Sequence, residues 1–219
     1  PEPGGDGGLP SDTIFSLWDT YRAQHPLLNL VQTRRNSDMI ESMLAHFDQS
    51  VHPMLPVWSH HANENWCMIG YHAVSVIADA LVKGNRGVDP ARALAACVST
   101  SRVPYYDGVG EMMALGWVPD EASGSSVSVT LELAYDDWCV AQLAGLAGDE
   151  ETAAAYLARV EQACRPDEAI DTFTSQAAEE ESEPRARLDA VVKKLRDSFN
   201  LVDSPKTIRD LGCRSAAEV

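Results

Sequence analysis

The residues from His72 to Leu81 form an almost unbroken run of small and apolar side chains, inside a longer helical stretch that ends at Gly84. A helix that is apolar on most of its sides has to be surrounded by other elements, so it lies inside a protein and not on its surface. Glycine is also a typical residue just after a helix C-terminus. The sequence therefore predicts an inner helix over 63–83 and a fold with inner and outer helices.

Apolar residues recur at helical spacing up to about residue 163, and no series of strands is visible. Besides 63–83, the expected elements are helices at about 12–24, from 37 onward, from 90 onward, at 126–147 and at 149–162, with a short glycine-interrupted stretch at 105–116. Pro26 is expected to stop the first of these, Ser37 to cap the second and Asp89 to cap the third. The predicted fold is all-α: a bundle, a solenoid or an α/α toroid.

The charge balance excludes several classes of partner. The chain carries 17 Lys and Arg against 33 Asp and Glu, which gives a formal net charge of −16. Nucleic acids and anionic membrane surfaces need clustered basic residues, so no nucleic-acid partner is predicted. No run of about 18 apolar residues is present either, and no membrane span is predicted. The residues Pro1–Gly8 do not look like a signal peptide, and no compartment is predicted.

The chain is expected to divide into three parts. Residues 1–12 are expected to be a flexible lead-in, residues 13–163 a helical domain and residues 164–219 a divergent tail. Of the 50 charged residues, 21 fall among the 55 positions from 165 onward, so the tail has a different surface. Within the tail an apolar stripe at helical spacing predicts an amphipathic helix at about 185–199.

The five cysteines show no metal-binding or redox spacing. They are Cys67, Cys97, Cys139, Cys164 and Cys213. An odd, scattered set without any CxxC pair is more typical of buried free thiols than of a disulfide framework. No set of metal ligands is predicted from spacing.

Tryptophan and acidic residues lie together at several expected helix ends. Trp18, Asp19 and Arg22 fall within about one helical turn, and Asp136-Asp137 lies beside Trp138 on the long helix at 126–147. An indole face packs on the C–H face of a pyranose, and carboxylates accept hydrogen bonds from its hydroxyls. This pattern suits a carbohydrate, although Trp18 is also typical of a core anchor and Asp19 of a solvent-exposed or Arg22-paired carboxylate.

Several strings in order resemble glycoside hydrolase family 92, the calcium-dependent exo-α-mannosidases. They are FSLWDTYRAQHPL at 15–27, SDMI at 37–40, LPVW at 55–58, MIGYHAV at 68–74, VIADA at 76–80, TLE at 130–132 and AYDDW at 134–138. The resemblance covers about 13–162. It implies that this part belongs to an (α/α)6 barrel, which in the family follows a β-sandwich. It also implies an inverting hydrolase that removes terminal α-linked mannose from glycans with a carboxylic acid, a carboxylate base and a calcium ion.

The resemblance is partial. The EGNAWQY-like, GNEP-like and GNDDxGQMSAWY-like strings that carry the family's acid, calcium ligands and base are absent from this sequence, and the resemblance ends near Arg159. The sequence therefore predicts a fragment without catalytic residues of its own and without the main calcium ligands. The rest of such an enzyme is therefore an expected partner of this fragment.

The resemblance implies which residues face the sugar. Asp19 is the foremost candidate, with Trp18 beside it and Arg22 expected to hold it in place. Glu64 is expected to face the pocket, although Asn65 replaces the family's usual threonine. His72 is a further candidate, and so is Asp137.

Two alternatives remain open. In the first, the chain is a non-catalytic helical protein that binds a partner through its acidic tail. In the second, it is a glycosidase whose acid and base come from Glu64 and from Asp136 or Asp137.

Overall fold

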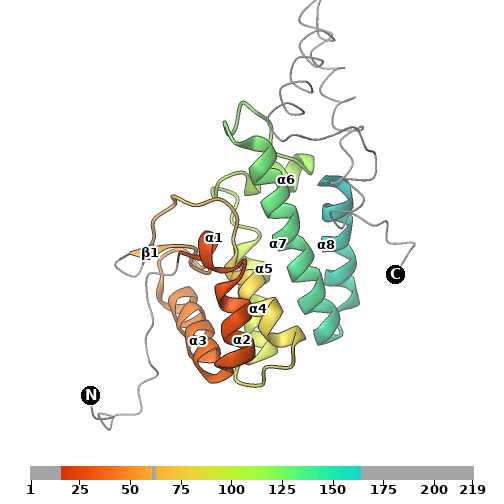
Figure 1. Cartoon of the computed structure of the whole chain (residues 1–219). Coiled ribbons are helices and arrows are strands. Elements are labelled where there is room, and N and C mark those ends of the chain that lie inside the picture. Colours follow the sequence, from red (N-terminus) through yellow and green to blue (C-terminus); the bar gives the residue numbers. More distant parts are fainter. Residues whose placement is uncertain (1–15, 61–62, 164–219) are drawn as a thin grey trace, which may run out of the picture. The chain divides into compact units, whose positions relative to one another are not determined.

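The computed structural model describes residues 16–60 and 63–163 of the chain, and this part is built almost entirely of helices (Figure 1). The elements are α1 Leu17–Thr20, α2 Gln24–Val31, α3 Thr33–Gln49, β1 Ser59–His60, β2 Asn63–Glu64, α4 Ala73–Val82, α5 Pro90–Thr100, α6 Val109–Leu115, α7 Ser126–Ala147 and α8 Glu150–Ala163. The two short strands pair antiparallel. The expected lead-in at 1–12 and the tail at 164–219, with its helix at 185–199, lie outside the described residues.

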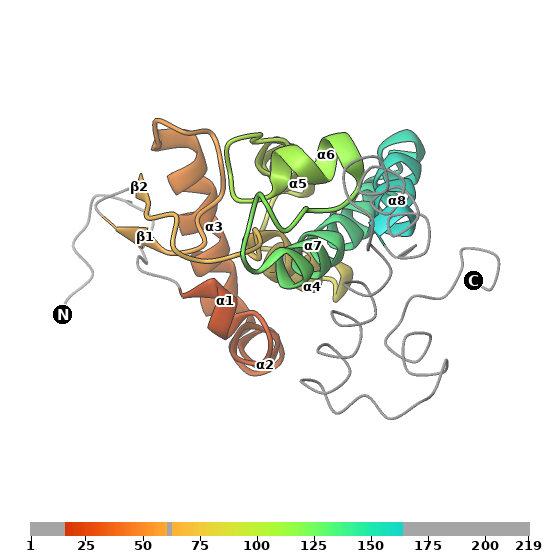
Figure 2. The ribbon, with the colours of Figure 1, turned by 90° about the horizontal axis from the view of Figure 1, so that it is seen from above.

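The core lies around α4 and α7. All but two of the ten residues of α4 are buried, as expected for the inner helix predicted there. This helix packs against α7, α2, α3 and α5, and α7 packs in turn against α8 and α5. Seen from above, α4 lies between α3 and α7, while α8 lies on the far side of α7 (Figure 2). The prediction of an all-α fold with inner and outer helices is confirmed.

Several helix ends follow from local chemistry as predicted. Asp89 accepts a hydrogen bond from the Ala91 backbone N–H at 3.1 Å and caps α5, which begins with Pro90. The helix α7 spans 126–147 as expected, and Gly148 ends it with a φ of 76°. A left-handed residue at this position is accessible to glycine at little conformational cost.

Three predicted helix ends are wrong. Pro26 does not stop a helix but lies in the first turn of α2, where its missing N–H has no intrahelical acceptor to lose. Ser37 does not cap a helix, because α3 begins at Thr33 and the Ser37 hydroxyl donates instead to the Thr33 carbonyl at 3.1 Å. The helix expected over 63–83 begins only at Ala73, since Trp66 and Gly70 adopt positive φ values.

Cys97 and Cys139 are buried free thiols, whereas Cys67 is exposed, so the expectation of a buried thiol is wrong there.

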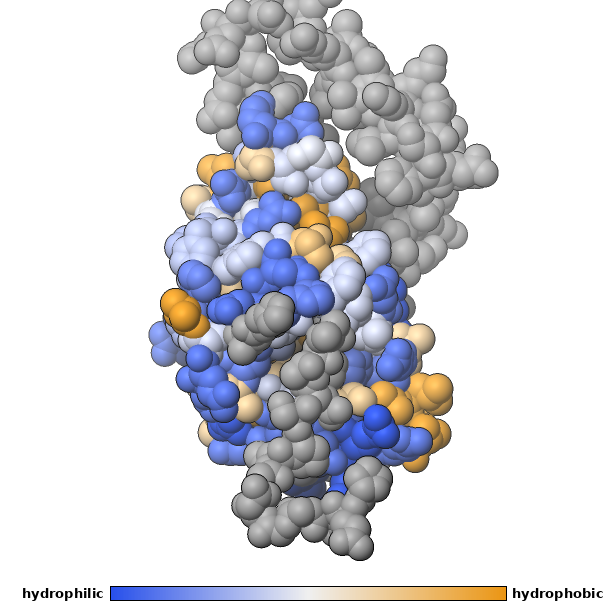
Figure 3. Space-filling view, turned by 90° about the vertical axis from the view of Figure 1, so that its left-hand side faces the viewer, coloured by the Kyte–Doolittle hydropathy of each residue, from blue (hydrophilic) through white to orange (hydrophobic). Residues whose placement is uncertain are grey.

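The face seen in Figure 3 is mostly hydrophilic, with hydrophobic side chains gathered in a few separate patches. None of the helices in residues 16–60 and 63–163 is long and apolar enough to cross a membrane.

Candidate functional site

Glu132 on α7 is the point at which three distant donors meet. Its Oε2 accepts a hydrogen bond from the Tyr21 hydroxyl at 2.9 Å, and its Oε1 accepts one from the Arg22 guanidinium at 2.9 Å. The Nε2 atom of His72 lies 3.2 Å from Oε2. Tyr21 and Arg22 follow α1 directly, and His72 directly precedes α4. One carboxylate therefore joins the ends of two helices to the middle of a third.

His72 lies between two carboxylates. Its Nδ1 is 2.9 Å from Asp136 Oδ1, its side chain has no exposed surface, and the Tyr21 ring stacks on it at a centroid distance of 4.0 Å. Burial by itself lowers the pKa of His72, but Asp136 and Glu132 raise it by more, to about 9. Burial likewise raises the pKa of Glu132, but hydrogen bonds from His72, Arg22 and Tyr21 lower it by more, to about 2. At neutral pH the site holds an imidazolium between carboxylates.

Behind His72, two neighbouring acidic side chains tie α4 to α7 and α8. Asp136 Oδ2 accepts the Tyr71 backbone N–H at 2.6 Å, and Asp137 Oδ1 accepts the Tyr71 hydroxyl at 2.5 Å. Arg159 Nε on α8 lies 3.0 Å from Asp137 Oδ2. Burial raises the pKa of Asp137 to about 7, although Arg159 and the Tyr71 hydroxyl lower it. Both acids are fully buried, and their hydrogen bonds to Tyr71 hold the start of α4 against α7.

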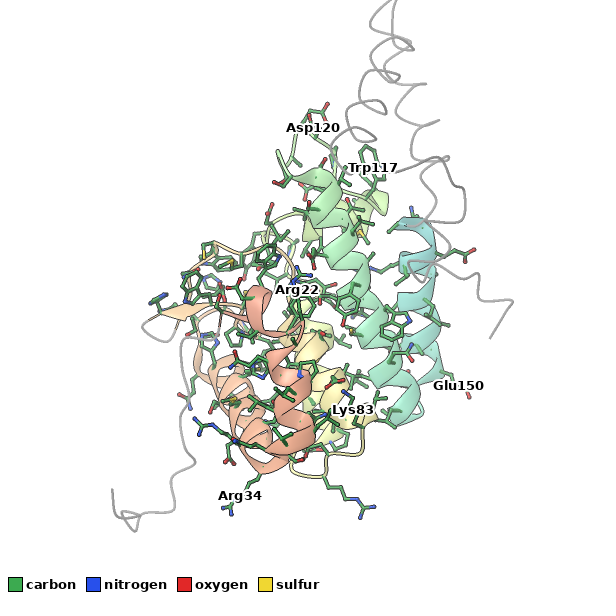
Figure 4. The ribbon with its side chains drawn as sticks, in the orientation of Figure 1. Arg22, Arg34, Lys83, Trp117, Asp120 and Glu150 are labelled. Atoms are coloured by element: carbon green, nitrogen blue, oxygen red, sulfur yellow. The ribbon has the colours of Figure 1, made fainter. Side chains whose placement is uncertain are left out.

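The exposed side of the site is formed by Arg22 and aromatic rings. The Arg22 guanidinium carbon lies 5.1 Å from the centroid of the Trp18 ring and 4.7 Å from that of Tyr21. Figure 4 places Arg22 between α1 and α7. An open pocket of about 360 Å³ lies beside it, lined by Tyr21, Arg22, Pro26, Ser75, Asp79 and Tyr135. The arrangement offers a guanidinium, carboxylates and aromatic faces to a polyhydroxylated ligand.

The structure brings three of the predicted site residues together. Arg22 and His72 both contact Glu132, and the Trp18 ring lies against the Arg22 guanidinium. Asp19 is exposed and accepts a hydrogen bond from the Ser16 hydroxyl. The expected Arg22–Asp19 pair is replaced by Arg22–Glu132, because α1 ends at Thr20 and the chain then turns toward α7.

Glu64 has a different environment from the one expected. Its side chain is buried, and its carboxylate accepts four backbone N–H groups. Those of Val57 and Trp58 bind Oε2 at 2.6 and 3.0 Å, and those of Asn65 and Trp66 bind Oε1 at 3.1 Å each. Glu64 therefore organises the loop around β1 and β2. A contact of Glu64 with the sugar stays a prediction.

Replacing Glu64 by glutamine is expected to lower the free energy of unfolding by about 2–3 kcal/mol. The amide nitrogen would face two backbone N–H donors, which then lose their acceptor. Urea unfolding measures the change, and amide hydrogen exchange in 57–66 is expected to become faster. Glu121→Gln, at an exposed turn, is the control and should change stability by less than about 0.5 kcal/mol. Equal effects of the two substitutions would contradict this role of Glu64.

Sequence reasoning did not single out Glu132 or the Tyr21 hydroxyl. Glu132 precedes Asp136 by four positions on a helix that was correctly predicted, so both acids lie on the same helix face. That spacing is the signal that was available. The donors that meet at Glu132 lie 60 to 111 positions away, and no local pattern indicates them.

The described residues do not fit the calcium ion that the family resemblance implies. Calcium takes six to eight oxygen ligands. Within residues 16–60 and 63–163 no group of three or more His, Cys, Asp or Glu side chains is placed to hold a metal ion. The carboxylates of Glu132, Asp136 and Glu64 accept hydrogen bonds from protein donors instead.

Comparisons with known proteins agree with this fold. Residues 9–162 match the sequence model of the glycosyl hydrolase family 92 catalytic domain. The chain is similar to a solved family GH92 α-mannosidase from Bacteroides thetaiotaomicron in complex with mannoimidazole, at 51% sequence identity and a TM-score of 0.67, over 69% of this chain and 20% of that chain. It is also similar to a family GH92 inverting mannosidase from Bacteroides thetaiotaomicron VPI-5482, at 30% sequence identity and a TM-score of 0.63, over 68% of this chain and 21% of that chain. No curated protein matches it.

These similarities confirm the expected fold class, part of an all-α toroid. The chain spans about a fifth of the length of the solved mannosidases that it matches.

Proposed function

The chain belongs to glycoside hydrolase family 92, and on this premise we propose that it supplies part of the sugar pocket of an α-mannosidase that removes terminal α-linked mannose from glycans. The observation that carries the proposal is the convergence of Arg22 and His72 on Glu132, with the Trp18 ring against the Arg22 guanidinium, beside an open pocket. A mannose-containing glycan is the proposed ligand.

Each of these side chains has a proposed task. Arg22 donates hydrogen bonds to sugar hydroxyls, and the Trp18 ring packs on the C–H face of the pyranose. The exposed Asp19 accepts a hydrogen bond from a hydroxyl. Glu132 fixes the Arg22 guanidinium, and His72 holds Glu132 through an ion pair at 3.2 Å.

The acid and base of the inverting reaction are not proposed among these residues. An inverting pair flanks the scissile bond with about 6.5–9.5 Å between its carboxyl groups and needs access to water. Asp136 and Asp137 are fully buried, and Glu64 is nearly so, with its oxygens bound to backbone N–H groups. Their environment disfavours the hypothesis that they are the acid and base.

The proposal is tested by replacing Arg22 with glutamine in the 219-residue chain. Binding of methyl α-mannoside, followed by saturation-transfer NMR, is expected to weaken at least about tenfold, because a charged donor to the sugar is lost. Arg92→Gln is the matched control. Arg92 is also an ion-paired, partly exposed arginine, with Glu41 and Asp48 each at 2.7 Å. Equal binding by the two variants, or an unchanged chain that does not bind the mannoside, would contradict the proposal.

The alternative of a non-catalytic protein that binds a partner through its acidic tail is not favoured by the family match. That tail lies outside the described residues.

A further inference from the structure

A second group of aromatic side chains lies in the loops and does not line the Arg22 pocket. This aromatic cluster consists of His52, Trp66, Tyr105 and Tyr106. The rings of His52 and Trp66 meet edge to face at 5.2 Å, and those of Trp66 and Tyr105 lie 5.9 Å apart. Trp66 is 41% exposed and Tyr105 is 59% exposed. Two large aromatic rings are therefore presented to solvent side by side.

The cluster has a rigid base. Tyr106 is buried, and its hydroxyl oxygen lies 2.8 and 2.7 Å from the carbonyl oxygens of Met68 and Gly70, which share its one hydrogen. Its ring lies 5.7 Å from that of Trp66. The Tyr105 hydroxyl is 2.9 Å from His52 Nδ1, which fixes the direction of that ring. The exposed rings are thus held in one arrangement before any ligand arrives, which lowers the entropic cost of binding.

Trp66 holds a strained backbone conformation. Its φ is 63°, the one positive φ of a non-glycine residue within 16–60 and 63–163. The Trp66 N–H donates to Glu64 Oε1, and the Cys67 N–H donates to the Asn65 side-chain oxygen, each at 3.1 Å, and these bonds keep the loop in place. A left-handed conformation is unfavourable for a bulky side chain, and such strain is concentrated at functional sites. Here it is not offset by full burial of the indole.

We infer that the aromatic cluster is a second glycan subsite, which binds a pyranose ring of a mannose-containing glycan outside the Arg22 pocket. The indole and phenol faces pack on the C–H face of the ring, while His52 and the Tyr105 hydroxyl bond to its hydroxyls. None of the four side chains lines the pocket beside Arg22. The class of ligand rests on the proposed function, and the site itself rests on the exposure, the fixed rings and the strain at Trp66.

The test measures how a soluble α-mannan in a native gel retards the 219-residue chain. Trp66→Ala and Trp66→Gly are each expected to weaken the retardation at least about tenfold, because the indole platform is lost. Glycine adopts a positive φ without strain, so Trp66→Gly should melt at a higher temperature than Trp66→Ala. Loss of binding in the more stable variant separates ligand binding from folding. Tyr105→Ala, at a second exposed ring, should weaken the retardation too.

Trp117→Ala is the matched control, because Trp117 is also a partly exposed tryptophan, follows α6 directly after Gly116, and is neither among the pocket-lining residues nor in the aromatic cluster. It should be retarded like the unchanged chain. The inference is overturned if the Trp66 and Tyr105 variants are retarded like the control, or if the unchanged chain is not retarded. The proposed function is judged separately by methyl α-mannoside. If Arg22→Gln abolishes both readouts and Trp66→Gly neither, the Arg22 pocket carries all the binding, and only the second subsite is disproved.

Discussion

Replacing His72 by glutamine is expected to lower the free energy of unfolding at pH 6.5 by about 3–5 kcal/mol. The imidazolium is fully buried between Asp136 and Glu132, at 2.9 and 3.2 Å. Glutamine carries no charge, so two carboxylates would face each other, and Asp136 has no exposed surface through which water could compensate. Removing one member of a buried charge network leaves the other charges without compensation, which is why the expected effect is large.

The pH dependence of stability identifies this effect. The pKa of His72 is raised from 6.5 to about 9, so between these values the folded chain holds a proton that the unfolded chain has released. Stability from this group is therefore fully present below pH 6.5 and is lost as the pH rises to about 9. Glu132 acts in the opposite direction at low pH. Its pKa is lowered from 4.5 to about 2, so its contribution is present above pH 4.5 and is lost toward pH 2.

Urea unfolding between pH 7 and pH 9 measures the contribution of His72. The lower end of this window lies at the pKa of Asp137, which is raised to about 7, so most of the slope above it comes from His72. The unchanged chain should lose stability across the window, and His72→Gln should abolish most of that loss. His60→Gln, at an exposed position in β1, is the control and should keep the slope. A slope that survives in His72→Gln would show that the imidazole is not the titrating group.

The helices were predictable because their signals are local. The helix at 126–147 follows from apolar spacing and from Gly148, and α5 follows from Asp89 and Pro90. The wrong predictions concern residues with two possible roles. Ser37 is a good cap, but in α3 its one hydroxyl hydrogen is shared between the Thr33 carbonyl of the preceding turn, at 3.1 Å, and the Asn85 side-chain oxygen, at 3.0 Å. Such a choice depends on partners that are distant in the sequence.

The candidate site likewise has residues that the sequence indicates and residues whose roles depend on distant partners. The strings at 15–27 and 68–74 located Trp18, Arg22 and His72, since family likeness is carried by sequence. The role of Glu132 depends on three donors brought together only by packing. The same holds for Glu64, whose four N–H partners lie on both sides of the short hairpin. A single acidic residue has no local pattern that indicates how many donors it will meet.

Gly70→Ala is expected to lower the free energy of unfolding by about 3–5 kcal/mol, through two separable causes. Gly70 has a φ of 74°, which is unfavourable for alanine. A Cβ atom there would lie 2.6 Å from Cε1 and Nε2 of the His72 ring and 3.1 Å from Asp136 Oδ2. The ring cannot simply turn away, because both of its nitrogens face carboxylates. The substitution therefore acts on the same buried network as His72→Gln, from the backbone side.

Gly84→Ala separates the two causes. Gly84 has a φ of 82°, and no atom lies within 4 Å of the position of its Cβ, so this variant carries the backbone cost alone, about 1 kcal/mol. The difference between the two variants in lost unfolding free energy then measures the cost of the steric clash with the His72 ring. Urea unfolding gives both values, and an NMR titration should show a lower His72 pKa in Gly70→Ala as the ring is displaced from its carboxylates. If Gly70→Ala and Gly84→Ala lower stability equally, the imidazole has room to move, and the fixed arrangement of His72 and Glu132 behind Arg22 is wrong.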